Sequence, residues 1–154
     1  MDLIRDFRKV SQSLRADQKL GISRAWTLFL MRGGLHGSPN QIRRNARNVL
    51  KQLFPKSTQA EIDRLVFYFL IRMSSAIGDQ MAHTGMKERT FEEATASRDK
   101  LADAKSSISE MSNSDLYQLQ MMMNKKQSLE SMISTLMKAA SDSQAEIAGN
   151  LKGA

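Results

Sequence analysis

Cysteine is absent from the sequence, and proline and glycine are scarce. Without cysteine the chain cannot form disulfide bonds, thiolate metal sites or cysteine nucleophiles. Two prolines and eight glycines in 154 residues leave room for long uninterrupted helices. Aromatic residues make up only 6% of the chain, whereas 11 methionines supply flexible apolar side chains. Methionine fills irregular gaps and tolerates repacking, so this composition suits a helical bundle or an adaptable interface.

Long hydrophobic runs are missing as well. The most apolar stretch, residues 65–71, is far shorter than the roughly 20 residues that a membrane span requires. The first eight residues carry charges throughout and contain no apolar stretch of the roughly 7–15 residues that a secretory signal needs. We therefore expect a soluble protein with no membrane span and no cleavable signal peptide.

No segment alternates apolar and polar residues as a β-strand does, so the sequence predicts an all-α fold. Apolar residues instead recur at helical spacing in six segments. These predicted helices cover residues 2–16, 23–32, 39–53, a segment opened by Thr58, residues 90–111 and residues 115–151.

Local signals predict where the second helix ends and the third begins and ends. The glycine pair at residues 33–34 is a strong helix breaker. Ser38 is a typical N-cap, and Pro39 then occupies the first helical position, where its missing N–H has no cost. Pro55 is expected to end the third helix.

The next two helices are predicted to begin with capping boxes. Thr58 is followed three residues later by Glu61, and Thr90 by Glu93, so each pair can satisfy two backbone N–H groups that have no helical acceptor. The composition after residue 77 becomes small and polar, which predicts a break around residues 83–85.

The helix opened by Thr58 is apolar around nearly its whole circumference between residues 62 and 73. Such a helix must be buried on most sides, either within the chain or against partner chains. We expect residues 65–71 to be the most buried part of the structure.

The last predicted helix carries a broad apolar stripe. About 37 helical residues would span roughly 55 Å, which exceeds the diameter of a small domain. The pattern fits either a long bundle helix or a C-terminal helical hairpin, residues 90–151, that packs against other copies in a coiled-coil-like manner. The residues of the predicted assembly interface are Leu116, Leu119, Met123, Leu129, Met132, Ile133, Leu136, Met137, Ile147 and Leu151.

No residue constellation supports catalysis, a cofactor or a metal. His36 and His83 are far apart and lack a second ligand at helical spacing, so we interpret both as loop residues. The glycines around residues 33–37 lack the lysine and hydroxyl ending of a phosphate-binding loop. The serines have no histidine and aspartate context that would activate a nucleophile. We therefore predict that the protein is not an enzyme.

Positive charge is concentrated in the first half of the chain. Residues 1–72 contain 14 Lys and Arg against 5 Asp and Glu, whereas residues 73–154 contain 9 against 11. This asymmetry indicates an anionic partner for the first half, or pairing between the two halves.

The third helix holds the densest basic patch. Three of its cations recur every four residues, a plausible track for phosphates, and Asn40, Gln41 and Asn45 could read bases. The linker at residues 33–40, however, is longer than the 3–4-residue turn of a helix-turn-helix. The patch consists of Arg43, Arg44, Arg47 and Lys51.

Residues 62–151 resemble the EspA-like filament subunits of bacterial type III secretion systems. The resemblance rests on the hydrophobic helix around residues 65–76, a small polar stretch at residues 101–105 and the long helix from Leu119 to Leu151. Residues 90–151 are also similar to the smaller needle subunits. The resemblance implies a protein that is secreted unfolded without a cleavable signal, is kept soluble by a small secretion chaperone, and polymerises through its C-terminal helix. Without that resemblance a cytoplasmic location is expected.

Two hypotheses follow from the sequence. The first is a non-catalytic helical subunit that assembles with itself through residues 56–154, with residues 1–55 as a basic helical region or as part of one continuous domain. The alternative is a basic helical adaptor that binds nucleic acid or an acidic protein through residues 1–55. Neutralising the basic face would impair only the adaptor, while disrupting the C-terminal stripe would impair only the assembly.

Overall fold

The computed structural model describes residues 3–83 and 129–151 as five α-helices, and no strand occurs in these two ranges. The all-α prediction is therefore confirmed for the described part of the chain. The helices are α1 (Leu3–Ser13), α2 (Ala16–Met31), α3 (Pro39–Leu53), α4 (Gln59–His83) and α8 (Leu129–Leu151).

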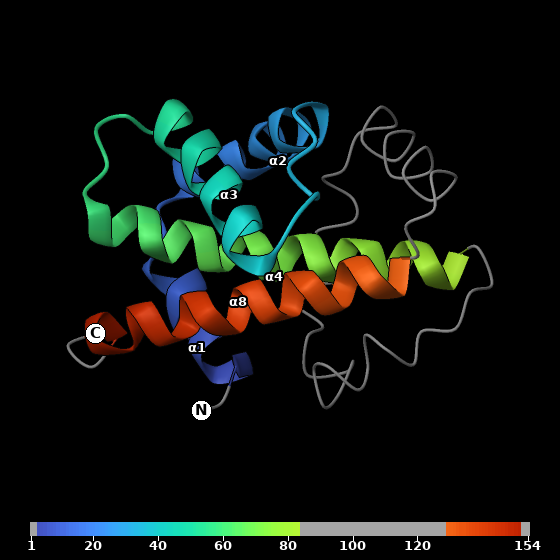
Figure 1. Ribbon diagram of the computed structural model, residues 1–154. Helices are drawn as coiled ribbons and strands as arrows, with labels where there is room; N and C mark the ends of the chain where they lie inside the picture. Colours follow the sequence, from blue (N-terminus) through green and yellow to red (C-terminus); the bar gives the residue numbers. More distant parts are fainter. Residues whose placement is uncertain (1–2, 84–128, 152–154) are drawn as a thin grey trace.

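Helices α4 and α8 form the centre of the fold. They run side by side in opposite directions, and α3 lies across both of them (Figure 1). Helix α2 packs on α3 and α4, and α1 contacts α4 and α8 on a different side from α3 (Figure 1). Every one of the other described helices therefore contacts α4, which makes it the central element.

The sequence of α4 explains its position. The capping box is present, because Glu61 N–H donates to Thr58 Oγ1 at 3.2 Å and Thr58 N–H donates to Glu61 Oε1 at 3.4 Å. Every residue from 65 to 77 is buried, and residues 65, 67, 69 and 70 have no exposed surface at all. The predicted burial of residues 65–71 is thus confirmed, and it is achieved within the chain.

Helix α3 has the predicted bounds. Gln41 N–H donates to the Ser38 hydroxyl at 3.2 Å, so Ser38 is the N-cap and Pro39 occupies the first turn. The helix ends at Leu53, one residue before Phe54 and two before Pro55.

The first two helices differ from the prediction. The expected single helix over residues 2–16 ends at Ser13, and α2 begins at Ala16 rather than at residue 23. The chain turns at residues 14–15, where Arg15 N–H donates to the Gln18 side chain at 2.8 Å. Because the Gln18 side chain caps the helix here, the turn needs no glycine or proline, and the sequence contains none at this point.

Gly21 lies inside α2 instead of in a linker. A Cβ at this position would lie 2.5 Å from Cζ of Phe54, so glycine lets the ring pack directly against the helix backbone. The end of α2 was predicted correctly, since the helix stops at Met31 and Gly33 takes a φ of 67°.

The apolar stripe of α8 faces the core of its own chain. Five of the residues predicted to form an assembly interface are buried here, each no more than 7% exposed: Met132, Ile133, Leu136, Met137 and Ile147. They pack in the same hydrophobic cluster as α4, α3 and α1. While α8 occupies this position, these five side chains are not available to another copy.

The remaining predictions for the C-terminal half fall beyond the described residues. Leu116, Leu119 and Met123 lie outside them, as do the Thr90–Glu93 capping box and the hairpin turn at residues 112–115. The described helix α8 begins at Leu129 and ends at Leu151, but the side chains of these two residues are not among those described.

The hydrophobic core crosses the boundary proposed at residue 55. One cluster of buried residues extends from Ile4 in α1 to Ile147 in α8. A buried hydrogen bond from Gln144 Nε2 to Asp6 Oδ2, 2.8 Å long, also joins α8 to α1. Within the described residues, no helix is long and apolar enough to cross a membrane.

Candidate functional site

Helix α3 presents three differently composed sides. Its inner side is apolar and buried, and consists of Ile42, Ala46, Val49 and Leu50. Its outer side is polar and exposed, and consists of Gln41, Arg44, Asn48, Lys51 and Gln52. The third side faces α4 and α8 and carries Arg43 and Arg47. The four cations of the predicted basic patch are therefore divided between two sides of one helix.

Arg43 connects α3 to α8. Its Nε donates to Ser143 Oγ at 3.1 Å, its Nη1 donates to Asn40 Oδ1 at 3.1 Å, and its Nη2 forms an ion pair with Glu146. The Arg43 side chain is 16% exposed, whereas that of Glu146 is 54% exposed. The ion pair therefore lies at the rim of the bundle, where such pairs contribute little to stability.

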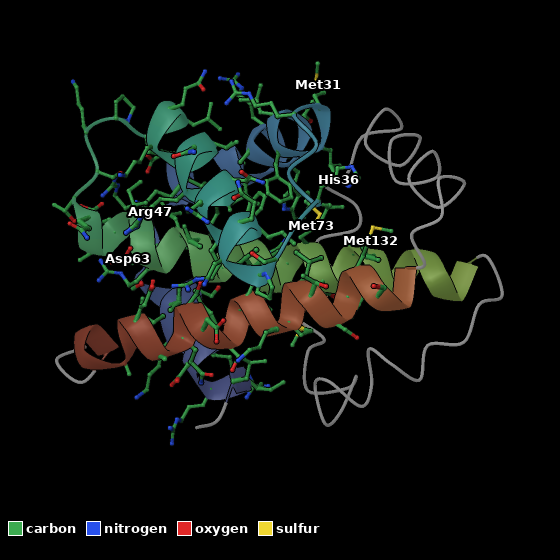
Figure 2. The ribbon with its side chains drawn as sticks, in the orientation of Figure 1. Met31, His36, Arg47, Asp63, Met73 and Met132 are labelled. Carbon is green, nitrogen blue, oxygen red and sulfur yellow. The ribbon has the colours of Figure 1, made fainter. Side chains whose placement is uncertain are left out.

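Arg47 connects α3 to α4. Both of its terminal nitrogens donate to the same oxygen, Oδ1 of Asp63, and both side chains are largely buried. Figure 2 shows the two residues facing each other between α3 and α4. Pairing of this kind neutralises the charge locally and holds α3 at a fixed position on α4.

A concave depression lies where α3, α4 and α8 meet. It has a volume of about 390 Å³ and is lined by Asn40, Arg43, Arg44, Arg47, Asp63, Val66 and Glu146. The structure thus brings three of the four predicted basic residues to one cavity. Lys51 is not part of its lining and lies further along the exposed side of α3.

Two cations of the patch have no acidic partner. Arg44 and Lys51 are exposed and form no hydrogen bond or ion pair with any described residue. The predicted track of Arg43, Arg47 and Lys51 is therefore incomplete, because the first two are held by carboxylates. Asp63 and Glu146 were not identified from the sequence, because each lies on a different helix from its arginine. Asp63 is 16 positions from Arg47, and Glu146 is about a hundred from Arg43.

The polar residues considered for reading bases have structural roles. Asn40 accepts a hydrogen bond from Arg43. Gln41 donates to Asn45 Oδ1 at 3.0 Å, and Asn45 Nδ2 donates to the Gly34 carbonyl at 3.2 Å. Asn45 thus fixes the loop between α2 and α3, and this network leaves it poorly suited to contact a base.

Two large apolar side chains are exposed on α2. Leu20 is 79% exposed and Met31 is 67% exposed. They lie eleven residues apart, which is close to three helical turns, so they share one side of the helix. Figure 2 shows Met31 pointing away from the bundle at the end of α2.

His36 does not belong to a metal-ligand cluster in the described part of the chain. No group of three or more His, Asp or Glu that could hold a metal occurs among residues 3–83 and 129–151. His36 lies in the loop after α2, as predicted, whereas His83 is the last residue of α4 rather than a loop residue.

Comparison with known proteins adds no relative. No family model matches the chain, and neither a curated protein nor a solved structure shows significant similarity to it.

Proposed function

We propose that this protein is a non-catalytic helical interaction module that binds an anionic macromolecule through the outer side of α3. The observation that carries the proposal is the pair Arg44 and Lys51, both exposed and both without an acidic partner among the described residues. They lie seven residues apart, or two helical turns, at a separation of about 10 Å along the helix axis. The neighbouring Asn48 is also exposed and can add hydrogen bonds.

The charge of the bundle supports this proposal. Residues 3–83 and 129–151 contain 15 Lys and Arg against 8 Asp and Glu, which equals the +7 of the whole chain. The excess therefore belongs to the described part of the chain, helices and connectors together. A surface field of this sign raises the rate at which an anionic partner is encountered, in a salt-dependent manner.

The proposal can be tested with a short DNA duplex, a single-stranded RNA and an acidic peptide as fluorescent probes. The double variant Arg44→Gln/Lys51→Gln should bind the preferred probe at least about tenfold more weakly than the wild type, measured by anisotropy. For a nucleic acid, the slope of log K against log salt should also fall by about 2, because each lost phosphate contact removes about 1.

Helix α1 offers a matched control. Arg8 and Lys9 are exposed and have no partner in the described part of the chain, so Arg8→Gln/Lys9→Gln removes the same charge from a different surface. Equal losses in the two double variants would indicate a non-specific effect of net charge and would contradict the proposal.

Self-association is the second candidate function. The exposed Leu20 and Met31 on α2 favour it, because solitary exposed apolar residues are ordinary but an aligned pair can extend an interface. The assembly of a secretion-type filament through Leu116, Leu119 and Met123 belongs to this candidate. Light scattering at several concentrations tests it, with a wild type that remains monomeric as the result against it.

A further inference from the structure

The depression between α3, α4 and α8 contains more hydrogen-bond donors than its acidic residues can use. A guanidinium group has five N–H donors. Those of Arg44 have no acceptor among the described residues. Arg47 directs both terminal nitrogens to a single oxygen of Asp63, and its Nε donates to no described residue.

The lining of the depression also carries more positive than negative charge. Three guanidinium groups face two carboxylates, which leaves one positive charge within the cavity. Asp63 is held by Arg47 and is only 15% exposed, so it stays in place. Glu146 is 54% exposed and can turn outward, which would free Arg43 for another acceptor. The first turns of α3, whose dipole is positive at this end, border the same cavity.

We infer that this depression binds a small phosphorylated ligand. A phosphate group offers several acceptor oxygens, and the planar guanidinium fork of arginine matches two of them at once. The depression is concave, and its volume of about 390 Å³ is within the range of small-molecule pockets. Arg44 makes the principal contact, Arg43 and Arg47 add further donors, and Glu146 competes with the ligand.

The inference shares Arg44 with the proposed function, but the two can be separated at Lys51, which belongs to the outer side of α3 and not to the cavity. Isothermal titration calorimetry of the full chain with pyrophosphate and with ATP provides the test. Arg44→Gln should weaken binding of both probes by about tenfold or more, the loss of one charge-assisted bidentate contact. Glu146→Gln should strengthen it severalfold, because this variant removes a competing negative charge.

Arg8→Gln is the control, since it removes the same charge from an exposed position on α1. It should change the affinity by less than about twofold, the range expected for a distant screened charge. Lys51→Gln should leave pyrophosphate binding unchanged while it weakens binding of a macromolecular probe.

The titrations can overturn the inference, and they can also separate it from the proposed function. The inference is overturned if the wild type binds neither probe, if Arg44→Gln and Arg8→Gln behave alike, or if Glu146→Gln weakens binding. Pyrophosphate binding with the expected response and no macromolecular binding would uphold the cavity and reject the proposed function. Macromolecular binding without pyrophosphate binding would do the reverse.

Discussion

Glu61 caps the start of α4 and also contacts the start of α2. Its carboxylate accepts from Thr58 N–H at the start of α4, and from Arg15 Nη1 and Gln18 Nε2 of the α2 start, both at 3.2 Å. The hydrogen bond from the Thr58 backbone, followed by those from the Thr58 hydroxyl and Arg15, lowers the pKa of Glu61 below 4.5. The charge of Asp17, followed by the hydrogen bond to Glu61, raises the pKa of Arg15.

The lowered pKa predicts a pH-dependent contribution to stability. A carboxylate whose pKa is lower in the folded state stabilises the fold above its ordinary pKa, and this contribution is lost as the pH falls through the folded-state value. Glu61→Gln should therefore reduce the free energy of unfolding by about 0.5–1 kcal/mol at neutral pH. The difference from the wild type should disappear progressively below pH 4.5, measured by urea unfolding. A difference of constant size across this range would contradict the electrostatic explanation.

For single residues, the sequence predicts contacts between positions that are close together in the chain. The Ser38 and Thr58 caps depend on residues three positions apart, so their spacing is sufficient to identify them. The two partners of Arg43 on α8, Ser143 and Glu146, lie about a hundred positions away, and no spacing rule links them to it. The sequence therefore identified the arginines and Asn40 of the lining, but it did not predict the cavity itself or its acidic residues.

Among the described helices, α4 is the central one. It contacts all of the other described helices, and Phe67, Phe69 and Leu70 have no exposed surface. Aromatic contacts fix its neighbours, since Tyr68 stacks on Phe7 of α1 at 5.4 Å and Phe69 meets Phe29 of α2 edge to face at 5.0 Å.

A matched pair of substitutions tests this burial. Leu70→Asp places a carboxylate in the core and should destabilise the protein by more than about 4 kcal/mol, enough to unfold it. Leu20→Asp makes the same change at a position that is 79% exposed, and should cost less than about 1 kcal/mol. Thermal unfolding followed by circular dichroism distinguishes them, and similar melting temperatures for the two variants would refute the central position of α4.

The elements also show why helix boundaries differ in predictability. Gly33, Pro39 and Pro55 mark their boundaries with residues that restrict or release the backbone. The turn at residues 14–15 has no such residue, and Gly21 lies within α2, in close contact with Phe54. A glycine in a sequence does not reveal whether it serves a turn or close packing.

For the whole molecule, the position of α8 determines which surfaces are free to bind. An apolar stripe on a helix predicts burial but not the chain that provides the burial, because both arrangements remove the same side chains from water. In the structure Met132, Ile133 and Leu136 close the core of their own chain. Among the described surfaces, the candidates for binding a partner are therefore the outer side of α3 and the exposed pair Leu20 and Met31 on α2.

The double variant Ile133→Glu/Leu136→Glu, studied beside the wild type by circular dichroism and analytical ultracentrifugation, tests this arrangement most directly. Both side chains are fully buried, and glutamate is itself a good helix former, so a loss of helix would result from core disruption. We predict that the variant loses helicity and thermal stability together, and that the wild type sediments as a monomer at every concentration. A wild-type oligomer that the double variant converts into a folded, fully helical monomer would contradict the account and restore the C-terminal stripe as an assembly interface.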